Sequence, residues 1–129
     1  MQDSVNLVVY SDNAEVRQTV IEGVGLRAAK DLPKIEWTEA ATPAAVMELV
    51  DGTRPEVVVL DGEANKVGGM ALARQIQVEA EHQPRFVILT ARQQDEWLAA
   101  WAKASATVQA PYDPIDLQEK VAVALREAI

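Results

Sequence analysis

Two carboxylates and a hydroxyl group follow short apolar segments of this chain. Asp61 comes directly after Val57–Leu60, Asp12 follows Leu7–Tyr10 after one residue, and Thr90 follows Phe86–Leu89. If folding places the two carboxylates side by side, they repel each other unless a cation joins them. Mg²⁺ suits such a pair, because it typically binds through one or two carboxylates together with water and phosphate oxygens. These residues therefore predict a cation site that contains Asp61.

The apolar segments before these residues are typical of strands in a parallel sheet. Val57–Leu60 is a run of branched apolar residues, as expected for a strand that is buried on both faces. Ala106–Val108 is a weaker run, and helical patterns separate the runs along the chain. Ile35–Glu39 alternates with period two, which is typical of an edge strand. The chain therefore predicts an α/β fold with a doubly wound parallel sheet in the strand order 2-1-3-4-5.

In such a sheet the carboxyl ends of the strands share one edge, where ligands bind. Because the first and third strands are neighbours in this order, Asp12 and Asp61 should lie close together. Simpler roles remain open for some of these residues, since Asp12 or Asn13 can cap the next helix and Thr90 can cap the helix that follows it. Burial of the Asp61 carboxylate without a partner would be costly, which favours a functional role for it.

Residue types also predict the ends of several helices. Thr42-Pro43 and Asp113-Pro114 each place a capping side chain before a proline, and proline is favoured at the first helical position. Asp51-Gly52 predicts the end of the helix that begins at Pro43.

The order and spacing of these residues resemble the receiver domains of two-component response regulators. The resemblance covers the chain from about Val5 to its end, and the matching positions are Ser11-Asp12, Asp61, Gly69, Thr90 and Pro111–Leu117. It implies a flavodoxin-like (βα)5 fold and a role in phosphorelay signal transduction. Asp61 would accept a phosphoryl group from a histidine kinase or a small donor, and Thr90 would contact that group.

The resemblance also implies a metal site and a backbone geometry. Asp12, Asp61 and the backbone carbonyl of Glu63 would be the protein ligands of Mg²⁺. The peptide bond between Ala110 and Pro111 would be cis, as is usual at this step in the family.

Three positions depart from the family pattern and predict an atypical receiver. Ser11 replaces one acid of the usual acidic pair, Ala110 replaces a lysine, and Thr107 replaces the usual switch aromatic. We expect weak Mg²⁺ binding, because a neutral hydroxyl stands in for a carboxylate. We also expect little conformational response, because the ammonium group that would pair with phosphorylated Asp61 is missing.

Glu63 and Arg92 are candidates to compensate for these changes. Arg92 could supply the lost positive charge in the phosphate site, and Glu63 could add a carboxylate to the metal site. The simpler alternative is an exposed ion pair between them, which would contribute at most about 1 kcal/mol.

The composition limits the classes of function. The 129 residues suit a single receiver-like domain over residues 1–129 without an output domain. A formal net charge of −8 argues against nucleic-acid binding and against an anionic membrane surface. No apolar run has the length of a membrane-spanning helix, and we expect a cytoplasmic protein. The further lysine and acidic motifs of aspartyl phosphatases are not found, so we expect no enzyme activity.

A protein of this kind would act through contacts with other proteins. Trp97 and Trp101 are four residues apart and share a face of the predicted fourth helix. With Tyr112, they predict an interface on helix 4, strand 5 and helix 5, a common docking and dimerisation surface in the family. The tryptophans could instead cover the sheet. The expected function is a phosphoacceptor switch, and the alternative is an interaction module that works without phosphorylation.

Overall fold

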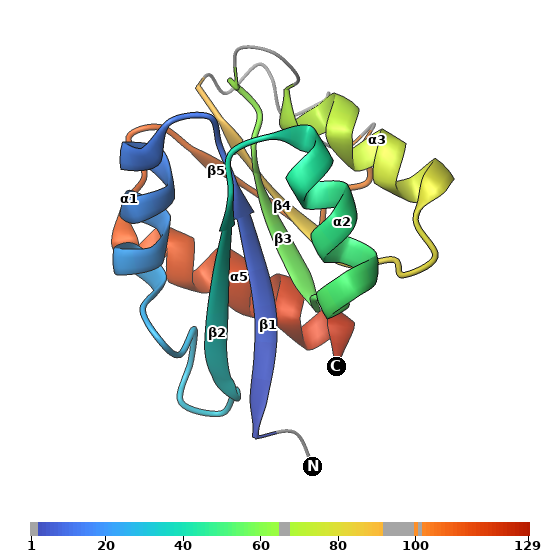
Figure 1. The fold of residues 1–129 in the computed structure, drawn as a ribbon. Helices are drawn as coiled ribbons and strands as arrows, with labels where there is room; N and C mark the ends of the chain where they lie inside the picture. Colours follow the sequence, from blue (N-terminus) through green and yellow to red (C-terminus); the bar gives the residue numbers. More distant parts are fainter. Residues whose placement is uncertain (1–2, 65–67, 92–99, 101) are drawn as a thin grey trace.

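A parallel sheet of five strands forms the centre of the protein, in the order β2-β1-β3-β4-β5 (Figure 1). The computed structural model describes residues 3–64, 68–91, 100 and 102–129. The strands are β1 (Ser4–Tyr10), β2 (Lys34–Ala40), β3 (Val57–Asp61), β4 (Arg85–Thr90) and β5 (Ala106–Gln109). All neighbouring strands run parallel, so the predicted fold class and strand order are confirmed.

The apolar runs of the sequence account for the position of each strand. In the sheet Val58 lies between Val8 of β1 and Phe86 of β4, and all three are buried. Both faces of β3 are covered, as its unbroken apolar run predicts. In β2, by contrast, Lys34, Glu36 and Glu39 are exposed, which agrees with its place at the edge of the sheet.

Helices cover both faces of the sheet. Helices α1 (Ala14–Val24) and α5 (Pro114–Ala128) pack on one face, and α2 (Pro43–Thr53) and α3 (Gly69–Glu79) pack on the other (Figure 1). Each helix contributes an apolar stripe to the core on its side. None of the helices in the described part of the chain has the length and apolar character needed to cross a membrane.

Side-chain caps fix where three of the helices begin. The Asn13 side chain accepts a hydrogen bond from the Glu15 amide, Thr42 accepts one from Ala45, and Asp113 accepts one from Asp116. Asn13, rather than Asp12, is therefore the cap of α1. The caps predicted at Thr42 and Asp113 are confirmed.

The predicted end of α2 at Asp51-Gly52 was wrong. The helix continues to Thr53, whose hydroxyl donates a hydrogen bond to the Leu49 carbonyl at 2.8 Å. It ends where Arg54 adopts a left-handed conformation with φ of 50°. Gly52 keeps a helical backbone, and the backbone first leaves the helical conformation at Arg54.

One glycine beside Asp61 is required by close backbone packing. The Gly62 amide donates to the Leu89 carbonyl of β4 at 2.9 Å, and an added Cβ at Gly62 would lie 2.6 Å from that oxygen. Any other residue would push β3 and β4 apart next to the predicted site.

Replacement of Gly62 by alanine should therefore destabilise the protein by about 1–3 kcal/mol, the usual cost of overpacking. Gly52→Ala is the matched control, because a Cβ added at Gly52 would meet nothing within 4 Å. In a helix this change should stabilise the protein by up to about 1 kcal/mol. Urea unfolding of both variants measures the difference, and equal stability of the two would contradict the packing argument.

Candidate functional site

Asp61 lies at the carboxyl end of β3 and is almost wholly removed from water, with 4% of its surface exposed. Its Oδ2 atom accepts a hydrogen bond from the Ser11 hydroxyl at 2.7 Å. Its Oδ1 atom accepts one from the backbone amide of Glu63 at 2.9 Å. Each carboxylate oxygen therefore has a neutral donor, one from the end of β1 and one from the loop after β3.

Ser11 is fully buried at the end of β1, and its hydroxyl, amide and carbonyl groups all form hydrogen bonds. Its hydroxyl oxygen accepts a hydrogen bond from the Asn13 amide at 3.0 Å, and its own amide donates to the Ala40 carbonyl at 3.2 Å. The Arg17 guanidinium donates to the Ser11 carbonyl at 2.7 Å and forms an ion pair of 2.9 Å with Glu39. Ser11 is thus tied to α1 and to β2.

Asp12 follows Ser11 and is exposed. Burial raises the pKa of the Tyr10 hydroxyl above its ordinary value, and the negative charges of Asp12 and Asp61 raise it further. Both carboxylates are therefore close enough to act on the same phenol group. In the described part of the chain, no group of three or more acidic, histidine or cysteine side chains could hold a metal ion.

Thr90 ends β4 beside β3 and is fully buried. Its backbone carbonyl accepts a hydrogen bond from the Ala110 amide at 2.8 Å. Its Oγ1 atom, however, has no hydrogen-bond partner among the described residues. A buried hydroxyl left unsatisfied costs about 1–3 kcal/mol, so this atom can take a partner that the described residues do not supply.

The segment after β5 completes this edge of the sheet. The peptide bond between Ala110 and Pro111 is cis, as expected. Tyr112 is half-buried, and its pKa is raised to about 12 by burial and by the charges of Asp61 and Glu63. The phenol therefore stays protonated and neutral beside the carboxylates.

No family model matches the chain. It is 39% identical over 123 residues to the uncharacterized response regulatory protein Rv3143 of Mycobacterium tuberculosis, covering 95% of this chain and 92% of the relative. The chain belongs to the response regulator family.

Solved receiver domains share the fold of this chain. The receiver domain of Francisella response regulator 1452 superposes with a TM-score of 0.79 at 14% identity, covering 97% of this chain and 99% of that one. The chemotaxis response regulator CheY4 of Vibrio cholerae gives a TM-score of 0.78 at 16% identity, covering 95% and 99%. At this level of identity the likeness concerns the fold alone.

The receiver brings some of the predicted site residues together. Asp61 is buried between Ser11 and the Glu63 amide, and Thr90 ends the adjacent strand. Glu63 has an exposed side chain. Arg92, Trp97 and Trp101 lie outside the described residues, so their predicted roles in the phosphate site and the interface stay predictions. Thr107, which replaces the switch aromatic, is half-buried in β5.

Sequence reasoning missed two contributors to this site. Arg17 lies on α1 without any motif that marks it, although its place one turn along the helix from the strand end is compatible with its contact to Ser11. Tyr112 was predicted as an interface residue only, and the structure adds its electrostatic coupling to Asp61.

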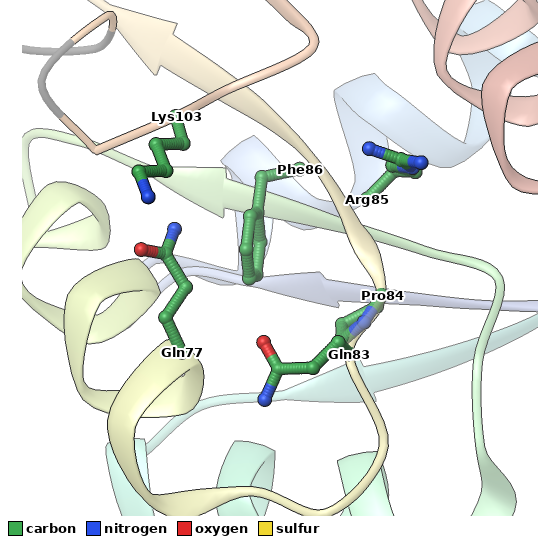
Figure 2. Close-up of a pocket in the computed structure, with 6 residues that line it drawn as sticks. All are labelled: Gln77, Gln83, Pro84, Arg85, Phe86 and Lys103. Carbon is green, nitrogen blue, oxygen red and sulfur yellow. The ribbon is translucent and has the colours of Figure 1, made fainter.

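A cavity of about 500 Å³ lies away from this site, around the amino end of β4. Figure 2 shows the six side chains that line it, which are Gln77, Gln83, Pro84, Arg85, Phe86 and Lys103. The two amides serve the fold, since Gln77 donates to the Ala102 carbonyl and Gln83 donates to the Ile76 and Ala80 carbonyls at the end of α3. Because the cavity lies at the amino end of β4 and Thr90 lies at the carboxyl end, the cavity is separate from the carboxylate site.

The charge of Asp61 should be measurable at Tyr112. Asp61→Asn removes one of the two negative charges that disfavour the phenolate, so the pKa of Tyr112 should fall from about 12 toward 10. Ultraviolet absorbance during an alkaline titration reports ionisation of the phenol, and Tyr112→Phe identifies which part of the signal belongs to Tyr112. An unchanged Tyr112 titration in Asp61→Asn would show that the two groups are not coupled.

Proposed function

We propose that this receiver is a phosphoacceptor switch in phosphorelay signalling, and that it acts as a signalling protein rather than as an enzyme. Asp61 is the acceptor, and the phosphoryl donor is a histidine kinase or a small phosphate donor. The observation that carries the proposal is the Thr90 hydroxyl, which is buried at the end of the strand next to Asp61 and has no hydrogen-bond partner within the described part of the chain. A phosphoryl oxygen on Asp61 would accept its hydrogen bond.

The chemistry requires a nucleophile and stabilisation of negative charge. A carboxylate oxygen of Asp61 forms a bond to phosphorus while the bond from phosphorus to the donor breaks and the donor leaves with that electron pair. Catalysis of this transfer depends mainly on positioning and on charge stabilisation. Ser11 and the Glu63 amide hold the carboxylate in place, and Thr90 offers a donor to the product.

Asp12, Asp61 and the backbone carbonyl of Glu63 are the groups that would hold Mg²⁺. Two carboxylates fit an ion that keeps several waters, which is the usual behaviour of Mg²⁺. When bound, the ion would neutralise charge on the phosphoryl oxygens. We propose that its binding is weak, because Ser11 provides no third carboxylate.

One observation favours the alternative of an interaction module that works without phosphorylation. Both oxygens of Asp61 already have hydrogen-bond donors within the protein. In that case Asp61 would hold the ends of β1 and β3 together, and partners would bind the folded receiver directly.

Incubation with acetyl phosphate and Mg²⁺ should add one phosphoryl group to the wild type, as measured by intact mass. Asp61→Asn should abolish the mass gain, because it removes the nucleophile. Ala110→Lys should keep the gain and enlarge the NMR shifts caused by beryllofluoride, since the new ammonium can pair with the modified group. If saturating donor and Mg²⁺ leave the wild type unmodified, the interaction module is the better account.

A further inference from the structure

We propose that Ser11 is a positioning residue that takes the place of a cation at Asp61. Its hydroxyl proton, rather than its oxygen, faces the carboxylate, so the serine competes with Mg²⁺ for Asp61. The inference deepens the proposed function, because it concerns the same acceptor, and it rests on that function for its meaning in signalling. It goes beyond the mere loss of a carboxylate ligand at this position.

The hydrogen-bond partners of Ser11 determine where its proton lies. A serine hydroxyl has one hydrogen to donate and two lone pairs that accept. The Asn13 backbone amide can only donate, so its bond of 3.0 Å to the Ser11 Oγ uses a lone pair. An ionised carboxylate can only accept, so the bond of 2.7 Å to the Asp61 Oδ2 uses the hydroxyl hydrogen.

The rest of the protein keeps Ser11 in this orientation. The side chain is fully buried. Its backbone is fixed on both sides, by the Ala40 carbonyl and by the Arg17 guanidinium. The Arg17 side chain is itself only 15% exposed and is held by its ion pair with Glu39. The Ser11 hydroxyl is therefore held in place as a hydrogen-bond donor to Asp61.

A cation shared by Ser11 and Asp61 would have to displace this proton. The two oxygens are 2.7 Å apart, and the hydroxyl hydrogen lies between them. A metal ion on the same oxygens would break a hydrogen bond to a charged group, which is among the stronger kinds. Even without such sharing, the Ser11 hydroxyl draws on the negative charge that the Oδ2 atom of Asp61 would offer to Mg²⁺, and it holds the carboxylate in place without a metal.

The two possible roles of Ser11 predict opposite effects of Ser11→Ala on Mg²⁺ binding. If the hydroxyl competes with the ion, the variant should bind Mg²⁺ more tightly than the wild type, by up to roughly 10- to 100-fold, the equivalent of one such hydrogen bond. If the oxygen is a ligand, Ser11→Ala should bind more weakly, and either this result or an unchanged affinity would overturn the proposal. Calorimetric titration with Mg²⁺ gives the affinity.

NMR adds a readout at the hydrogen bonds themselves. The Asn13 amide donates to the Ser11 hydroxyl, and the Glu63 amide donates to Asp61. The NMR signal of the Glu63 amide therefore reports on Asp61, and Mg²⁺ should shift it at lower concentrations in Ser11→Ala than in the wild type. Ser11→Thr keeps a hydroxyl and should behave like the wild type. If Ser11→Thr shows the same Mg²⁺ dependence as Ser11→Ala, the effect could not be assigned to the hydroxyl.

A measurement without metal or phosphoryl donor keeps the two proposals separable. In a double-mutant cycle of Ser11→Ala and Asp61→Ala, urea unfolding should reveal a coupling of roughly 10-fold or more in the unfolding equilibrium constant. Additive effects would overturn the role of Ser11 even if Asp61 is phosphorylated. If the two substitutions are strongly coupled but the wild type takes no phosphoryl group, the proposed role of Ser11 would stand and the phosphoacceptor switch would be refuted.

Discussion

A carboxylate that is removed from water requires hydrogen-bond donors, and the structure around Asp61 follows from this requirement. The donors come from the two places that the sheet order brings within reach, which are the end of β1 and the loop after β3. The donor on β1 in turn needs its own support, which Asn13 and Arg17 provide. One buried charge thus organises the first helix, the second strand and the loop that begins at Gly62.

The two groups that donate hydrogen bonds to Asp61 in the described part of the chain are neutral. The Ser11 hydroxyl and the Glu63 amide donate to it, and Tyr10 and Tyr112 lie in its field as protonated phenols. Within the described residues, Asp61 is therefore held by hydrogen bonds from neutral donors.

Much of the fold could be predicted from the sequence, because it depends on local patterns. The run Val57–Leu60 defines a central strand, and the alternation of Ile35–Glu39 defines an edge strand. Thr42 and Asp113 mark helix starts through their own side chains. The end of α2 was not predictable in the same way, since it depends on the left-handed conformation of Arg54 rather than on Gly52.

The candidate site was predictable in outline only. Parallel strands end at one edge, so the closeness of Asp61 and Thr90 follows from topology. The direction of the Ser11 hydroxyl and the contact from Arg17 depend on side-chain orientation in the folded protein, which residue types do not reveal. The sequence identified Ser11 as a lost acid, whereas the structure identifies it as a hydrogen-bond donor.

The charges on β2 have a consequence for the behaviour of the protein at high concentration. An edge strand with unpaired backbone groups is a template for pairing with another chain, and charged side chains along it discourage such pairing. Lys34, Glu36 and Glu39 are exposed on β2, and the opposite edge strand β5 has only four residues. Both edges of the sheet thus carry features that discourage strand pairing with another chain.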